Sequence, residues 1–228
     1  MVIGNGLVAK AFYSYSDNNE FLIFASGVSN SKTSTEQDYQ KERQLCTGLL
    51  LEHSDKIFVY FSTCSIEDPD LKTTGYIKHK LGMENLIKGG SGHYYIFRLS
   101  NLAGFSRNKN TVLNYFNDHI SYDLPFECWK NAERNIIDVE DVYRVADYLL
   151  KNKIRVNQIT NIANIRNYTV PYIVQCIESF HQKKARMTEK EKGVPFKIDV
   201  SEILPVFEKL NIRFGDDYLP KLLKKYYH

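Results

Sequence analysis

Tyr76 and Lys80 are the residues whose types and spacing most directly suggest chemistry in this sequence. Residues four apart lie on one face of a helix, so the ammonium of Lys80 can sit near the phenol of Tyr76. A nearby cation favours the phenolate and lowers the pKa of the phenol. Such a tyrosine can exchange a proton with a substrate oxygen while the adjoining carbon exchanges hydride with a nicotinamide, so we expect Tyr76 to be a catalytic acid/base.

Thr63 closes the apolar run that precedes this helix. A hydroxyl at the end of a strand can hydrogen-bond the substrate oxygen that Tyr76 protonates, which completes a three-residue constellation at one sheet edge. Taken alone, a pair such as Tyr76 and Lys80 is more often a surface pair of a helix, because both residue types are abundant in this chain. Thr63 favours the catalytic interpretation.

Gly4 and Gly6 follow a short apolar run and precede a segment, Leu7 to Tyr13, with helical apolar spacing. Glycines lack the Cβ that would keep a ligand away from the backbone, so the N–H groups of this turn can approach a pyrophosphate. The alternative is an ordinary tight turn. The order of strand, glycine turn and helix favours cofactor binding.

The amino-acid composition limits the class of protein and its partners. The 228 residues are 43% apolar and 25% charged, enough for a substantial core, and the net charge of +3 is too small to indicate nucleic acid as a partner. The four cysteines form no C-x-x-C pair and no secretory signal is recognisable, so we expect a cytoplasmic protein with reduced thiols. No apolar run reaches the roughly 20 residues of a membrane span. The histidines lack ligand spacing, so no metal site is expected.

The first hundred residues alternate between strand and helix patterns. Strands are predicted over residues 1–3, 21–25, 56–63 and 94–99, and helices over residues 7–13, 34–51 and 76–87. This alternation predicts an α/β fold with a Rossmann-like parallel sheet and helices on both faces, and places ligands beyond the carboxyl ends of the strands.

The second half has a less regular pattern. Helices are expected over residues 111–120, 141–150, 172–180 and 218–227, and strands over residues 134–139 and 156–162. Asp141 is a candidate cap for the second of these helices. The charged stretch over residues 182–192 is expected to be mobile.

Five motifs in order along the chain resemble the extended short-chain dehydrogenase/reductases. They are Gly4-Asn5-Gly6-Leu7-Val8-Ala9, Phe61-Ser62-Thr63, Tyr76-Ile77-Lys78-His79-Lys80 with Glu84, Arg98-Leu99-Ser100-Asn101-Leu102-Ala103-Gly104, and Arg134-Asn135-Ile136-Ile137-Asp138-Val139-Glu140-Asp141-Val142. More narrowly, the chain is similar to the NAD-dependent epimerase/dehydratase group, whose members modify nucleotide-linked sugars. The likeness extends from Met1 to about Phe180.

The resemblance implies a role for each matched residue. Tyr76 is the acid/base, Lys80 lowers its pKa and holds the nicotinamide ribose, and Thr63 positions the reacting oxygen. The residues implied in binding NAD or NADP are Gly4, Asn5, Gly6, Leu7, Val8, Ser26, Gly27 and Lys80, and those implied in binding the substrate are Asn101 and Arg134. A guanidinium suits a diphosphate because its planar fork binds two oxygens, although Arg134 could also be an ordinary surface residue.

The sequence departs from the family in two places. Between Ala11 and Phe21, about ten residues replace the second strand, its helix and the third strand, so the adenosine-binding half is truncated and NAD cannot be told from NADP. In an alternative register, residues 21–25 are the second strand and Ser31-Lys32 lies near a 2′-phosphate. The dehydratases also carry Asp-Glu after the catalytic threonine, where this chain has Cys64-Ser65, which places epimerisation or keto reduction above dehydration.

We therefore expect an NAD(P)-dependent oxidoreductase or epimerase that acts on a nucleotide-linked sugar for surface polysaccharide synthesis. Residues 1–165 should form the nucleotide-binding core, with substrate-lobe insertions around residues 105–135, and residues 166–228 a C-terminal substrate lobe. In this family, the helices expected at residues 34–51 and 76–87 commonly form a two-fold interface, which implies a homodimer. The alternative is a non-catalytic relative that has lost its cofactor and serves as a nucleotide-sugar-binding or scaffold protein.

Overall fold

A five-stranded parallel sheet forms the centre of the computed structural model, which describes residues 1–29 and 34–227. Its strands, in spatial order, are β1 (Val2–Ile3), β2 (Phe21–Phe24), β3 (Ile57–Thr63), β4 (Tyr94–Leu99) and β9 (Gln158–Ile162). Every neighbouring pair is parallel. The expected α/β fold with a parallel sheet is confirmed, and the strand predicted over residues 94–99 has the predicted bounds.

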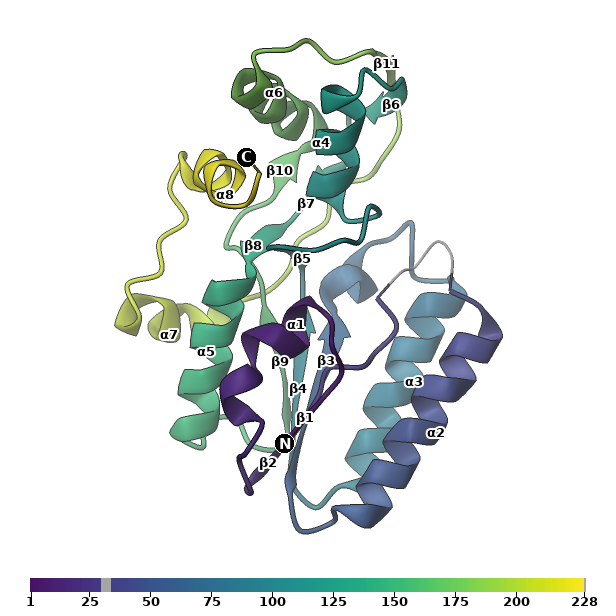
Figure 1. Ribbon diagram of the computed structural model, residues 1–228, viewed down its shortest axis with the longest axis vertical. Helices are drawn as coiled ribbons and strands as arrows, with labels where there is room; N and C mark the ends of the chain where they lie inside the picture. The colour runs from purple at the N-terminus through teal and green to yellow at the C-terminus, as the bar shows by residue number, and fades with distance from the viewer. Residues whose placement is uncertain (30–33, 228) are drawn as a thin grey trace.

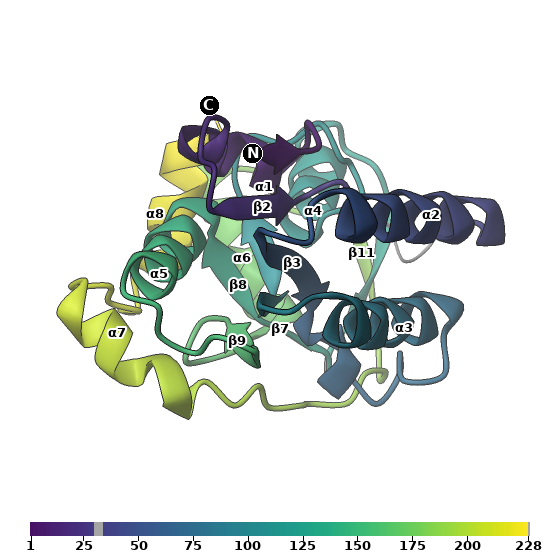
Figure 2. The same ribbon diagram turned by 90° about the horizontal axis from the view of Figure 1, so that it is seen from below.

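Helices cover both faces of the sheet (Figures 1 and 2). The helices α1 (Leu7–Ala11) and α5 (Val139–Lys151) lie on one face, and α2 (Glu36–Glu52) and α3 (Gly75–Gly90) lie together on the other. The strands β2, β3 and β4 are largely buried apolar runs because they are covered on both sides, and all four residues of β2 are buried. Phe21 and Ile23 point into the core beneath α1 and α5, whereas Leu22 and Phe24 point into the core beneath α2 and α3.

A second group of elements stands above the carboxyl ends of the strands (Figure 1). It contains α4 (Val112–Ser121), β6 (Phe126–Trp129), β7 (Glu133–Arg134), β10 (Tyr168–Thr169), α6 (Val170–His181), β11 (Met187–Lys190) and α8 (Tyr218–Tyr226). Here α6 packs against both α4 and α8, and the sheet connects to this group through the paired strands β5 (Asn101–Ala103) and β8 (Ile136–Asp138). A further helix, α7 (Leu204–Lys209), packs against α5. The chain division at residue 165 stays a prediction.

Three local expectations were wrong. Helix α5 begins at Val139 and is capped by Asp138, whose carboxylate accepts a hydrogen bond from the N–H of Glu140, whereas Asp141 accepts one from the hydroxyl of Tyr218. The strand expected over residues 134–139 is divided into β7 and β8. Part of the stretch expected to be mobile forms β11, which pairs in parallel with β6.

The connection through α1 has an unusual hand. The steps from β1 to β2, from β2 to β3 and from β3 to β4 all run in the same direction across the sheet, yet α1 lies on the face opposite α2 and α3. Crossovers that step in one direction but pass over opposite faces have opposite hands. Those through α2 and α3 are right-handed, as in about 98% of such connections, so the one through α1 is left-handed.

The two glycines of the first turn have different local requirements. Gly4 has a φ of +123°, and a Cβ there would lie 2.5 Å from the carbonyl oxygen of Ala25, so both its conformation and its close neighbour exclude a side chain. A Cβ on Gly6 would meet nothing within 4 Å. Gly4 is therefore needed for the turn itself, whereas Gly6 is free of packing requirements.

We expect Gly4→Ala to destabilise the fold by about 1–3 kcal/mol, because the added methyl group forces the turn away from β2. Gly6→Ala, two residues along, is the matched control and should change stability by no more than about 0.5 kcal/mol. Urea unfolding of both variants measures the difference. Equal stability of the two variants would contradict this account of the turn.

Candidate active site

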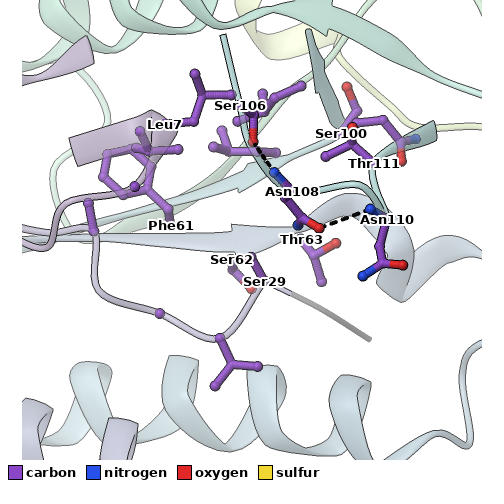
Figure 3. A pocket seen from close by; sticks show the side chains of 18 of the residues that line it. Leu7, Ser29, Phe61, Ser62, Thr63, Ser100, Ser106, Asn108, Asn110 and Thr111 are labelled. Atoms are coloured by element: carbon purple, nitrogen blue, oxygen red, sulfur yellow. Dashed lines mark hydrogen bonds between the residues drawn. The ribbon is translucent and has the colours of Figure 1, made fainter. Parts of the chain in front are cut away.

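A cavity of about 780 Å³ lies beyond the carboxyl ends of β1 to β4 (Figure 3). Its walls come from the turn after β1, the segment after β2, the end of β3, the start of α3, the end of β4 with β5, and the loop before α4. This is where parallel α/β sheets bind their ligands. Ser106, Asn108 and Asn110 line the cavity from the loop before α4, and Thr63 lines it from the end of β3.

The structure brings the three expected catalytic residues to this cavity. Tyr76 and Lys80 line it from the first two turns of α3, and Thr63 lines it from the last position of β3. The hydroxyl of Thr63 interacts with the phenol of Tyr76 and also accepts a hydrogen bond from the N–H of Ser65 at 3.0 Å. The Lys80 ammonium lies 6.0 Å from the centre of the Tyr76 ring.

The electrostatics of Tyr76 differ from the expectation. Burial raises its pKa to about 12, and the hydroxyl of Thr63 opposes only part of this rise. The negative charge of Glu42 raises the pKa further. In the protein without ligands, Tyr76 is therefore a protonated phenol at neutral pH, and the expected lowering of its pKa by Lys80 is not found.

The ammonium of Lys80 is engaged by Glu42, a residue that the sequence analysis did not identify. Lys80 donates hydrogen bonds to a carboxylate oxygen of Glu42 at 3.3 Å and to the hydroxyl of Tyr60 at 2.9 Å. Tyr60 in turn donates to Glu42 at 2.8 Å. The other carboxylate oxygen accepts from the backbone N–H of Val28 at 2.6 Å and lies 2.9 Å from Nε2 of His79. All the side chains in this network are buried.

This network fixes the charge of Glu42. Burial alone would raise the pKa of its carboxyl, but the hydrogen bond with His79 and the charge of Lys80 outweigh burial and hold the pKa at about 2, below the ordinary 4.5. Burial lowers the pKa of Lys80, and Glu42 opposes that shift. The carboxylate therefore favours the charged form of the buried Lys80 side chain, against the effect of burial.

A second buried carboxylate holds the end of β3 against α3. Glu84 accepts a hydrogen bond from Ser62 at 2.6 Å and a bidentate pair of hydrogen bonds from Arg98 at 2.9 and 2.8 Å. Such two-point pairing fixes orientation as well as distance. It positions Ser62, and with it the neighbouring Thr63, at the cavity wall.

The predicted cofactor residues divide into two groups. Those that line the cavity are Asn5, Gly6, Leu7, Val8, Gly27 and Lys80. Gly4 and Ser26 do not line it. They lie where the turn after β1 contacts the segment after β2. Two features suit a bound polar ligand: the open space in front of Gly6, and the hydroxyl of Ser100, a lining residue whose oxygen is buried without a hydrogen-bond partner.

The predicted substrate residues also divide. Asn101 lines the cavity and donates a hydrogen bond to the carbonyl of Asn135 at 2.8 Å. Arg134 is not among the lining residues, and its guanidinium donates to the carbonyl of Glu133. The exposed Arg107 in the loop before α4 lines the cavity instead. Arg107 was not predicted from the sequence because it lies in an irregular loop without a periodic pattern.

Solved structures share this fold. UDP-glucuronic acid 4-epimerase from Bacillus cereus, in complex with UDP-glucuronic acid and NAD, is 18% identical and superposes with a TM-score of 0.72 over 96% of this chain and 76% of that chain. RMD from Pseudomonas aeruginosa, complexed with NADPH, is 14% identical with a TM-score of 0.72, over 98% of this chain and 96% of the other. The dTDP-glucose 4,6-dehydratase from Bacillus anthracis, in complex with NAD, is 13% identical and superposes with a TM-score of 0.69. The superposition covers 96% of this chain and 77% of that chain.

The likeness to the NAD-dependent epimerase/dehydratase group is thus confirmed at the level of the fold. No protein-family model matches the sequence, and no curated protein matches it significantly. The fold and the cavity at its strand ends together define the class of site, a crevice at the carboxyl ends of a Rossmann-like parallel sheet.

We expect Glu42→Gln to lower the free energy of unfolding at neutral pH by about 3 kcal/mol, because Lys80 is left buried without its anion. Adding Lys80→Met to this variant should recover most of the loss, since no unpaired charge then remains. The matched control is Glu52→Gln, at the exposed end of the same helix, which should have no effect. Denaturant unfolding of all three variants measures these changes.

The pH dependence provides an independent check on the same network. The folded-state pKa of Glu42 is about 2, below the ordinary 4.5, so the stabilisation it provides is complete above the higher value and is lost as the pH falls toward the lower one. The stability of Glu42→Gln should change less steeply across that window. Parallel stability curves for the variant and the wild type would refute this role of Glu42.

Proposed function

We propose that this protein is an NAD(P)-dependent oxidoreductase or epimerase that acts on a sugar linked to a nucleotide. The observation that carries the proposal is the meeting of Tyr76, Thr63 and Lys80 in one cavity with the open glycine turn at Gly6. Proteins of the same fold in complex with NAD, NADPH or UDP-glucuronic acid support it. A proton donor beside a nucleotide-binding turn is what reversible carbonyl reduction requires.

Each residue has a chemical task in this proposal. The nicotinamide, when bound, supplies or accepts the hydride. Tyr76 gives its proton to the substrate oxygen during reduction and takes it back during oxidation, and Thr63 holds that oxygen by a hydrogen bond. Lys80 presents a cation to the ribose side of the site. The backbone at Asn5 and Gly6 is open to phosphate oxygens because no side chain at Gly6 obstructs it.

The substrate half of the cavity is lined by polar side chains. Asn101, Arg107 and Asn108 face it, and the loop is held by Asn114, whose amide donates to the carbonyl oxygens of Ser106 and Asn108. We propose that Arg107 pairs with the diphosphate of the substrate, a task that the resemblance assigned to Arg134. A guanidinium at the cavity wall can bind two phosphate oxygens at once.

Reduction or epimerisation suits this site better than loss of water. The residue after Thr63 is Cys64, which is buried and directs its thiol to the carbonyl oxygen of Arg98. Cys64 does not line the cavity, and burial raises the pKa of its thiol, so it is poorly placed and too weak to replace the acid that dehydration requires. We place the reaction in the cytoplasm, where the four free cysteines would stay reduced, and in the synthesis of surface polysaccharide. In the part of the chain that the structure describes, no helix has the length and apolar character to span a membrane.

A second candidate is a binding protein that retains the crevice without turnover. The observation in its favour is the engagement of Lys80 by Glu42, which leaves Tyr76 with a raised pKa. Mass spectrometry of ligands that copurify with the native protein separates the candidates. A nicotinamide dinucleotide supports the enzyme, whereas a nucleotide sugar alone supports the binding protein.

We expect Tyr76→Phe to lower kcat by about 10²- to 10⁴-fold with nicotinamide binding unchanged, because only the proton donor is lost. Nicotinamide absorbance measures turnover against a panel of nucleotide sugars, and fluorescence titration measures binding. Because the pKa of Tyr76 is raised to about 12, wild-type oxidation should accelerate as the pH rises from neutral, whereas reduction, which needs the protonated phenol, should not. Full activity of the variant would remove Tyr76 from the mechanism.

We further propose a homodimer formed through α2 and α3. These helices lie side by side and expose three leucines, Leu45, Leu51 and Leu81. Leu45→Glu combined with Leu81→Glu should convert the dimer to a monomer in sedimentation velocity, because charges cannot be buried unpaired in an apolar interface. Leu204→Glu, at an exposed leucine of α7, is the control and should leave the dimer intact. A wild-type monomer would refute the proposal.

A further inference from the structure

The order of the strands bears on how much of a dinucleotide this site can hold. In the doubly wound fold the strand order is 3-2-1-4-5-6, and the dinucleotide lies across the point at which the order reverses. Here the order β1-β2-β3-β4-β9 follows the chain without reversal, and β1 forms the edge of the sheet. The four strands β1 to β4 therefore take the places of strands 1, 4, 5 and 6.

The left-handed crossover supports this correspondence. In the doubly wound fold, the helix after strand 1 leads to strand 2, on the side of strand 1 away from strand 4. Here α1 leads directly to β2, which lies on the other side of β1, and this change of direction reverses the hand of the connection.

The observed sheet order also rules out the alternative register, in which β1 would lie between β2 and a later strand. Residues 31–32, invoked in that register, lie outside the described residues.

The connector that replaces the missing elements is a packed structure. Phe12 is fully buried, with its ring centre 5.0 Å from that of Phe61, and the hydroxyl of Tyr15 donates to Asp147 on α5 at 2.8 Å. The amino terminus donates hydrogen bonds to the carbonyls of Asn18 and Phe21. This segment packs against α5 beside β1. None of its residues lines the cavity, and the last lining residue before it is Lys10 on α1.

The acidic residues of this connector cannot reach the cofactor. In the doubly wound fold, a carboxylate about 20 residues after the glycines binds the adenosine ribose. About 20 residues after its glycines, this chain has Ala25, Ser26 and Gly27, none of which carries a carboxylate. They directly follow β2, the strand that lies between β1 and β3 in the sheet. Asp17 and Glu20 precede β2, at the amino ends of the strands, and Glu20 forms an ion pair with Lys153 at 2.8 Å.

We propose that this site recognises a nicotinamide nucleotide only as far as its phosphates, and that the residues described by the structure make no specific contacts with the adenosine. The inference depends on the proposed function, since it concerns the cofactor of the same cavity. Its ligand class is the nicotinamide nucleotides as a group, including the mononucleotide. The site does not discriminate between NAD and NADP, because the 2′-phosphate that distinguishes them is on the adenosine ribose.

Calorimetric or fluorescence titration of the whole protein with NADH, NADPH and reduced nicotinamide mononucleotide tests this proposal. The three dissociation constants should agree within about tenfold, equivalent to about 1.4 kcal/mol, and AMP should not displace NADH. A larger preference for NADH over the mononucleotide, a larger difference between NADH and NADPH, or competition by AMP would overturn the inference. Failure of all three nicotinamide nucleotides to bind would instead refute the proposed function.

Two variants locate the binding. Gly6→Val fills the open space of the glycine turn and should weaken all three nucleotides by a similar factor. Lys10 is the exposed cation that lines the cavity from α1, so it is the candidate partner for a 2′-phosphate. Lys10→Ala should leave the ratio of NADPH to NADH affinity unchanged. A fall in that ratio of more than about tenfold would show that the adenosine side is recognised, contrary to the proposal.

Discussion

The buried ion pair between Glu42 and Lys80 is the interaction on which the rest of the site depends. Removing two charges from water is costly, and a buried pair persists only where further hydrogen bonds satisfy both groups. Tyr60, His79 and the N–H of Val28 provide these bonds, so one carboxylate ties α2 to α3, to β3 and to the segment after β2. The same crowding explains Gly27, because a Cβ there would lie 2.9 Å from the ammonium.

This pairing also determines what the phenol of Tyr76 can do before any ligand arrives. An isolated ammonium would stabilise a phenolate, but the carboxylate beside Lys80 offsets that field, and burial then dominates the pKa of Tyr76. The phenol is thus held as a proton donor, the form that carbonyl reduction needs. The hydroxyl of Thr63 holds the phenol by a side-chain hydrogen bond, and the pairing of Glu84 with Ser62 and Arg98 positions the end of β3 that carries Thr63.

The sequence predicted the sheet well because its signals are local. Apolar runs such as residues 94–99 and the glycine turn need no knowledge of distant partners. Glu42 was missed because its partners lie 37 and 38 positions away, although a charged residue between Tyr39 and Cys46 on the buried stripe of α2 was an available signal. The choice of Asp138 over Asp141 as helix cap depended on contacts with α8, which local spacing does not contain.

Packing explains how so short a connector can form a left-handed crossover and still leave the cavity intact. The right-handed preference arises from strand twist and is a matter of energy, so sufficient packing can override it. The packing is supplied by Phe12 and Tyr15, which attach the connector to β3 and α5. The elements that carry Tyr76, Lys80 and Thr63 all lie on the other side of β2, where the sheet is complete. A chain without strands 2 and 3 therefore keeps the elements that carry the proposed catalytic residues, and what it lacks is confined to the side of β1 where we propose that the adenosine is not recognised.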